Sequence, residues 1–125
     1  MEFYKCQLCG NIITFLNSSG VVPQCCGSVM SKLTENTVDA SQEKHIPVAD
    51  SVTGRVHVKV GSVAHPMQDV HYIEWIAVET QNGVAQIKKL QPEEVPEAVF
   101  EIADGDRAVK LYAYCNLHGL WSATV

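Results

Sequence analysis

The chain has 125 residues, of which 46% are hydrophobic and 18% charged, and its formal net charge is -5. This composition excludes a largely disordered chain and fits one ordinary domain, or one small and one medium unit. The chain contains no basic block, which argues against nucleic acid and against an anionic membrane surface as partners. No apolar run approaches the roughly 20 residues that cross a bilayer, and the beginning MEFYKC lacks the pattern of a secretion signal, so we expect a cytoplasmic protein.

The first segment, up to about Thr34, contains four of the five cysteines and only short apolar stretches, Ile12 to Leu16 and Val29 to Leu33. A unit of this size buries little and usually needs a metal to be stable. The run ENTVDASQE that follows, from Glu35 to Glu43, is polar and aperiodic. We interpret it as a linker or surface loop, which gives a first domain over residues 1–35 and a second over residues 36–125.

Beyond this run, apolar and polar residues alternate with a period of two, as in half-buried strands. Arg55 to Val60 places three valines on one face, and Asn82-Gly83 between two β-rich runs is a strong hairpin signal. No segment has a helical period over ten or more residues. We therefore predict an all-β protein whose second domain is a seven-stranded β-sandwich with an immunoglobulin-like topology. The strands expected from the pattern are 55–60, 72–80, 84–90, 99–103, 107–115 and 120–125.

The cysteines of the first segment form two pairs, Cys6 with Cys9 and Cys25 with Cys26. The two-residue spacing lets both thiolates of the first pair approach one metal, and Gly10 can take the positive φ that such a knuckle needs. Adjacent cysteines approach a metal less easily, so we expect an opened sulfur–metal–sulfur angle at the second pair. A redox dithiol of the thioredoxin kind is disfavoured because no βαβ pattern surrounds the first pair. Four thiolates favour zinc or a single iron, and spacing alone leaves open whether the metal is structural or redox-active.

Four of the five histidines lie at strand ends or in loops, where side chains from distant positions can converge on one rim of a sandwich. His57 is the exception, because it lies on the Arg55 and Lys59 face of its strand, and we expect it to be an ordinary surface residue. The four candidates are His45, His65, His71 and His118.

The fifth cysteine, Cys115, stands alone at the far end of the chain, three residues before His118. It shares strand parity with Val109, Leu111 and Ala113, which predicts a sulfur that points inward. Four imidazoles and one thiolate make five ligands. Zinc prefers four, so this set with one open position suits iron better.

The motifs CQLCGN, QCCG, EKHIPV, GSVAHPM, HYIEWI and YCNLHG occur in this order over essentially the whole chain. Together they resemble desulfoferrodoxin, the two-iron class of superoxide reductase. Every cysteine and four of the five histidines fall on the metal-ligand pattern of that family. Leu120 departs from the pattern, because many members carry a polar residue after HG, and this puts in doubt only the polarity around the site.

The resemblance implies two mononuclear iron ions. The first would be bound in a desulforedoxin-like domain by Cys6, Cys9, Cys25 and Cys26. The second would be the catalytic iron, with His45, His65, His71 and His118 in a plane and Cys115 on the axis. Glu43 is implied as a sixth ligand of the oxidised iron, and Lys44 as a positive charge that attracts superoxide.

Proteins of this family are homodimers that reduce superoxide to hydrogen peroxide without oxygen evolution and draw electrons from rubredoxin or a similar carrier. Three other functions are weighed against this one. The sandwich could serve only for electron transfer or metal binding, or it could be a zinc-stabilised adhesion-like domain without redox chemistry. Dismutation is a weaker alternative, because a thiolate-ligated ferric site is expected to resist the oxidation of superoxide.

Overall fold

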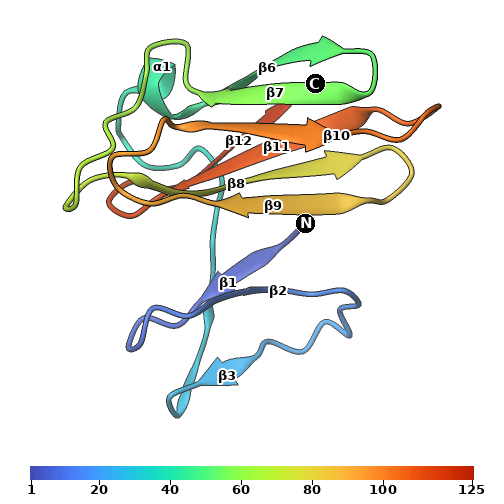
Figure 1. Ribbon diagram of the computed structural model, residues 1–125. Coiled ribbons are helices and arrows are strands. Elements are labelled where there is room, and N and C mark those ends of the chain that lie inside the picture. The colour runs from blue at the N-terminus through green and yellow to red at the C-terminus, as the bar shows by residue number, and fades with distance from the viewer. The chain divides into compact units, whose positions relative to one another are not determined.

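The structure is a computed structural model that describes residues 1–125. It divides into two compact units, residues 1–34 and residues 35–125, each with its own sheets (Figure 1). Glu35 belongs to the second unit, where its carboxylate accepts hydrogen bonds from Ser122 Oγ at 2.6 Å and Lys110 Nζ at 2.9 Å. The structure contains no helix with the length and apolar character of a membrane span.

The first unit consists of short antiparallel strands joined by turns that carry the cysteines. One sheet has the order β2-β1-β5 and a second sheet pairs β3 with β4. Cys6 and Cys9 lie between β1 and β2, and Cys25 and Cys26 lie where β3 turns into β4. The strands are β1 (Phe3–Lys5), β2 (Ile12–Thr14), β3 (Gln24–Cys25), β4 (Ser28–Val29) and β5 (Ser31–Lys32).

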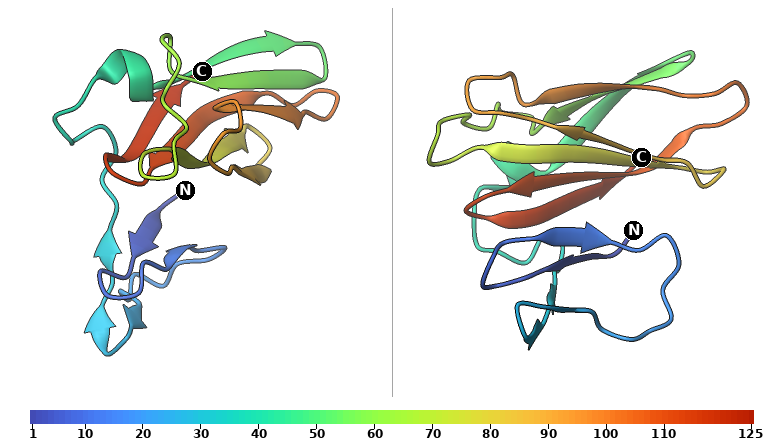
Figure 2. Two further views of the ribbon diagram at one scale, coloured as in Figure 1. Left: turned by 60° about the vertical axis from the view of Figure 1, so that its left-hand side comes forward. Right: turned by 60° about the horizontal axis from the view of Figure 1, so that its bottom comes forward.

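The second unit is a sandwich of two antiparallel sheets, with the strand orders β10-β7-β6 and β12-β11-β8-β9 (Figures 1 and 2). Its first, second and fifth strands form one sheet and the remaining four form the other, which confirms the predicted seven-stranded, immunoglobulin-like sandwich. The strands are β6 (Pro47–Val52), β7 (Arg55–Val60), β8 (Ile73–Thr80), β9 (Ala85–Lys89), β10 (Glu97–Glu101), β11 (Ala108–Cys115) and β12 (Gly119–Thr124).

The core lies between the two sheets and follows the alternation of the strands. The valines of β7 are buried and its polar residues are not, as predicted. In β11 the inward face carries Leu111, Ala113 and Cys115, but the prediction for Val109 was wrong. The register of β11 against β8 shifts between Ala108 and Lys110, so Ala108 replaces Val109 in the core.

Two elements were missed in the sequence. Strand β6 was not expected, because it begins at a proline and only its first residue is buried, which weakens the alternation. The interpretation of Glu35 to Glu43 as a loop was wrong at its end, where the one-turn helix α1 (Gln42–His45) begins. A single turn is too short to have a visible helical period.

The segments that carry the candidate ligands lie at one end of the sandwich, on the left in Figure 1. They are α1, which precedes β6, the segment 61–72 between β7 and β8, and the turn between β11 and β12. All four candidate histidines lie in these segments, and Cys115 is the last residue of β11. The fold therefore brings five metal-binding side chains from distant positions in the sequence to one rim.

Helix α1 packs against Gly61, the first residue after β7. A Cβ atom built on Gly61 would stand 2.9 Å from the carbonyl carbon of Lys44, and the carbonyl oxygen of Glu43 would be closer still. The same Glu43 oxygen accepts hydrogen bonds from the backbone amide of Val63 at 3.0 Å and from Ser62 Oγ at 3.3 Å. Only glycine leaves room for this close approach of α1 to the segment after β7.

Replacing Gly61 with alanine is expected to push α1 away from the sandwich, because backbone atoms cannot yield as a flexible side chain can. Overpacking of this kind costs about 1–3 kcal/mol of stability. Hydrogen exchange at the Val63 amide should become faster in Gly61→Ala, because its bond to Glu43 is lost. Gly83→Ala is the control for general destabilisation: its φ of 83° strains an alanine, but nothing lies within 4 Å of a Cβ there, so exchange at Val63 should not change. Unchanged exchange at Val63 in Gly61→Ala would show that the contact does not hold the helix.

Candidate metal centres

The four cysteines of the first unit come together in one group. Their sulfur atoms all lie within 4.8 Å of one another. Sγ of Cys9 is 3.6 Å from Sγ of Cys25, whereas the sulfurs of Cys25 and Cys26 are 4.0 Å apart. Four thiolates about 2.3 Å from one ion in a regular tetrahedron stand about 3.8 Å apart. The wider spacing of the adjacent pair agrees with the opened angle expected there.

The backbone around these cysteines favours thiolates. Amide groups of Cys9 and Leu8 point at the Cys6 sulfur and lower the pKa of this thiol to about 6. In contrast, interaction with the other sulfurs raises the pKa of Cys26 to about 12. Gly10 has a φ of 82°, as predicted for the knuckle. A cation bound among the four sulfurs would remove their mutual repulsion, so the group fits a metal.

The four candidate histidines form a square array. The ring centroids of His45 and His65 are 4.6 Å apart, those of His65 and His71 4.7 Å, those of His71 and His118 5.0 Å, and those of His118 and His45 4.9 Å. The diagonal from His45 to His71 measures 6.4 Å. In a tetrahedral array these distances would all be similar, so the rings stand as the corners of a square.

The nitrogen positions give the same result. Nε2 of His45 is 3.1 Å from Nε2 of His65 and 3.0 Å from Nδ1 of His118. Two nitrogens about 2.1 Å from one ion stand about 3.0 Å apart at a right angle and about 3.4 Å apart at the tetrahedral angle. The observed spacing is that of right angles, which suits iron with an open position better than tetrahedral zinc.

Hydrogen bonds to backbone carbonyls orient two of the rings. Nδ1 of His45 donates to the carbonyl of Ser41 and Nδ1 of His65 to the carbonyl of Pro66, each at 2.6 Å. With the proton fixed on Nδ1, Nε2 is left as the free base that a metal needs. His118 presents Nδ1 to the centre instead, because it lies in the tight turn only three residues after Cys115.

The environment of three of the rings favours their neutral form. Burial and, after it, the charges of the neighbouring rings lower the pKa of His65 to about 4. Burial also lowers the pKa of His45 and of His71. Nε2 of His71 is buried without a hydrogen-bond partner, which costs about 1–3 kcal/mol unless an ion takes that place. The site therefore fits a metal cation.

Cys115 reaches the histidines from the interior of the sandwich. It is fully buried in the hydrophobic core cluster, and its sulfur is 4.0 Å from Nδ1 of His118. Burial raises the pKa of this thiol, and the backbone amides of His118 and Leu117 act in the opposite direction. A nearby cation would hold the sulfur as a thiolate. Its ligand atom lies within 4.8 Å of those of His45, His71 and His118, while His65 completes the square beside His45.

Glu43 and Lys44 lie on α1, directly before His45, and both are exposed. The charge of Lys44 contributes to the lowered pKa of both His45 and His71, after burial and the other rings. The carboxylate of Glu43 makes no hydrogen bond or ion pair in the structure. The structure thus places the positive charge of Lys44 close enough to act on the square, whereas Glu43 is related to it through its position on α1.

The sequence analysis did not identify Trp121, which contacts two of the histidines of the square. Trp121 stacks on His45 with a centroid distance of 4.8 Å and an interplanar angle of 27°. Its Nε1 donates to the carbonyl of His118 at 3.1 Å. An apolar aromatic residue three positions after a ligand gave no signal of its own, because its contact to His45 crosses most of the chain.

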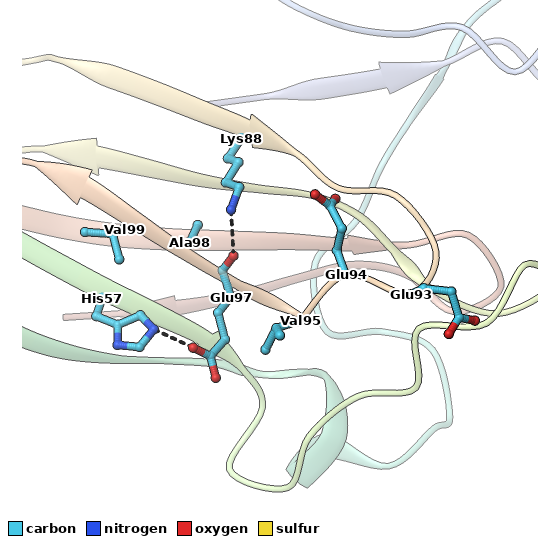
Figure 3. A pocket seen from close by; sticks show the side chains of 8 residues that line it. All are labelled: His57, Lys88, Glu93, Glu94, Val95, Glu97, Ala98 and Val99. Atoms are coloured by element: carbon cyan, nitrogen blue, oxygen red, sulfur yellow. Dashed lines mark hydrogen bonds and ion pairs between the residues drawn. The ribbon is translucent and has the colours of Figure 1, made fainter.

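His57 lies outside the square, as predicted. It faces a surface cavity of about 640 Å³, shown in Figure 3, which Lys88, Glu93 and Glu94 help to line. Nε2 of His57 is 2.7 Å from a carboxylate oxygen of Glu97. This pair joins neighbouring strands of the sheet β10-β7-β6 and has no part in the metal site.

Both units match known sequence families. The family described as the desulfoferrodoxin N-terminal domain matches residues 1–33, and the family described as desulfoferrodoxin matches residues 37–124. The desulfoferrodoxin of Syntrophotalea carbinolica is 49% identical over 98% of this chain and 95% of its own length. That of Nitratidesulfovibrio vulgaris is 46% identical over 98% of this chain and 94% of its own length.

Solved structures show the same resemblance. The superoxide reductase from Treponema pallidum covers 98% of both chains with a TM-score of 0.84 and 38% identity. The one-iron superoxide reductase from Giardia intestinalis covers 66% of this chain and 97% of its own, with a TM-score of 0.57 and 30% identity.

The two groups of side chains lie in the two ranges that match. The four-thiolate group falls within residues 1–33, and the group of four imidazoles and one thiolate falls within residues 37–124. They are the donor sets of the two-iron pattern, one for each of two mononuclear iron ions. The chain belongs to the desulfoferrodoxin family.

Proposed function

We propose that this protein is a superoxide reductase that reduces superoxide to hydrogen peroxide at the site of His45, His65, His71, His118 and Cys115. The square of imidazoles, with the Cys115 sulfur on its interior side, is the observation that carries the proposal. In the overall reaction superoxide takes up one electron and two protons and becomes hydrogen peroxide, and no oxygen is released. Relatives named superoxide reductase support the assignment.

The four imidazoles and the Cys115 thiolate would hold a ferrous ion, which would supply the electron and a positive charge. The amides of Leu117 and His118 that point at the Cys115 sulfur would moderate its electron donation. The half-buried His71 and His118 leave the site accessible to water, which provides the protons.

Superoxide is an anion, whereas the chain has a net charge of -5, so any attraction must be local. Lys44 is the positive side chain whose charge acts on both His45 and His71. We assign it to the attraction of superoxide. Glu43, on the same turn and without a partner, is assigned as the sixth ligand of the oxidised site.

The resemblance to the family also supports three further assignments. The electron donor would be a rubredoxin-like carrier, the protein would be a homodimer, and it would act in the cytoplasm. These stay predictions, as does a role of the four-thiolate site in passing electrons to the catalytic site.

The function is tested by mixing the anaerobically reduced, iron-loaded protein with superoxide. We expect one catalytic iron oxidised and one hydrogen peroxide formed per superoxide, with no oxygen evolved. Oxygen in half the amount of superoxide would indicate dismutation instead. Unchanged iron would leave only an electron-transfer or metal-binding protein, and zinc in natively purified protein would indicate the structural alternative.

Lys44→Ala is expected to slow the second-order reaction with superoxide roughly tenfold and to weaken its dependence on ionic strength. Pulse radiolysis measures this rate. Arg55→Ala is the matched control: it changes the net charge equally, but Arg55 lies at the other end of β7 from the site. Equal rates in Lys44→Ala and the unsubstituted protein would exclude the role of Lys44.

Glu43→Ala is expected to remove the carboxylate from the oxidised site and leave superoxide reduction almost unchanged. The absorption band of the oxidised site should shift, because one ligand has been replaced by water. Gln42→Ala, on the preceding residue of the same turn, is the control. If the oxidised spectrum of Glu43→Ala matches that of the unsubstituted protein at every pH, Glu43 is not a ligand.

A further inference from the structure

His71 differs from its neighbours in what holds its ring. Nδ1 of His45 and Nδ1 of His65 each donate to a backbone carbonyl, but no hydrogen bond orients the ring of His71. Its buried Nε2 has no partner either. The direction of this ring is therefore set by the backbone that carries it.

The side chain of Asn116 holds this backbone on both sides of His71. Its Nδ2 donates to the carbonyl of Val70 at 3.1 Å, and its Oδ1 accepts from the amide of Tyr72 at 3.0 Å. The backbone amide of Asn116 also donates to the carbonyl of Tyr72 at 3.2 Å. The two side-chain bonds thus fix the two peptides that flank the histidine, and the backbone bond fixes the peptide after them.

Asn116 lies directly after the point where the regular backbone pairing between β11 and β8 ends. The register of the two strands shifts between Tyr114 and Cys115, and Cys115 is the last paired residue of β11. Beyond that point the side-chain amide of Asn116 bonds the segment before β8. Backbone hydrogen bonds between Gln68 and His71, at 2.9 Å and 3.0 Å, close the turn 68–71 on the other side of the histidine.

The chemistry of the contact requires an amide of this length. Asparagine offers one acceptor and one donor on the same short side chain. Aspartate keeps the acceptor for Tyr72 but turns a carboxylate oxygen toward the carbonyl of Val70. Alanine removes both bonds.

We propose that Asn116 is a positioning residue that sets the corner of the imidazole square occupied by His71 and ties that corner to the Cys115 sulfur. Because Asn116 directly follows Cys115, a displacement of the His71 peptide moves the thiolate as well. Residues that orient metal ligands in this way commonly change metal affinity 10- to 100-fold when they are replaced. The proposal rests on the metal site of the proposed function, but its test does not use superoxide.

The test compares ferrous iron binding in the full chain, measured by competition with a chelator. In Asn116→Ala we expect iron affinity at the histidine site to fall about 10- to 100-fold, with no change at the four-cysteine site, which is an internal standard. Hydrogen exchange at the Tyr72 amide in the metal-free protein should become faster. The sulfur-to-iron absorption band of the oxidised histidine site should shift in energy.

Gln86→Ala is the control. Gln86 also joins two segments through its side-chain amide, since its Nε2 donates to the carbonyl of Glu101 at 2.8 Å. It lies on β9 and bonds the end of β10, away from the ligand-bearing connections, so Gln86→Ala should leave iron affinity within about twofold. Equal loss of affinity in both variants would show general destabilisation and overturn the proposal.

Asn116→Asp keeps the test decisive if Asn116→Ala does not fold. It preserves the size of the side chain and the acceptor for Tyr72, and it loses only the bond to Val70. We expect a loss of iron affinity smaller than that in Asn116→Ala, with a shift of the absorption band. Unchanged affinity and an unchanged band in Asn116→Asp would refute the proposal. Absence of superoxide reduction with these results intact would count against the proposed function alone.

Discussion

The placement of four imidazoles in a square at one rim of the sandwich is the constraint on which the second unit depends. A buried imidazole needs partners for both nitrogens, or it loses stability. Ser41 and Pro66 provide carbonyl partners for two of the outer nitrogens, and the inner nitrogens face one another at about the spacing of adjacent ligands. The polar atom left over, Nε2 of His71, is satisfied only when a cation is present. Folding of this rim and metal binding are therefore coupled.

The two groups of metal-binding side chains are brought together by different parts of the fold. In the first unit the ligands lie on two tight turns, so local backbone geometry alone brings them together. In the second unit they come from three connections that are far apart in the sequence, so the whole sandwich is needed to define the site. Rigid strands then hold the ligands to within the small tolerance that a fixed coordination geometry demands.

The sequence predicted the parts of the fold that local patterns specify. Strand β7 alternates clearly, and the Asn82-Gly83 turn joins β8 to β9, so both were predicted. Strand β6 and the single turn α1 were missed, because burial at a proline-led edge and a four-residue helix leave no periodic signal. Val109 was placed wrongly, because a register shift cannot be seen in the alternation.

The candidate ligands were identified from residue type and family resemblance, whereas their geometry was not. The square, the opposite ring nitrogen of His118 and the supporting contacts of Trp121 all depend on pairs that are distant in sequence. Asn116 lies in the YCNLHG motif, yet its two side-chain hydrogen bonds could not be predicted, because their partners lie more than forty residues earlier in the sequence.

All ligand-bearing connections lie at one end of the sandwich, and only tight turns lie at the other. Those turns, at Thr53-Gly54, Gln81–Gly83 and Asp104–Asp106, carry none of the candidate iron ligands. A loop graft at these turns would emerge away from the histidine site. The far end of the sandwich is thus suited to immobilisation on an electrode or a carrier, with the reactive face left open.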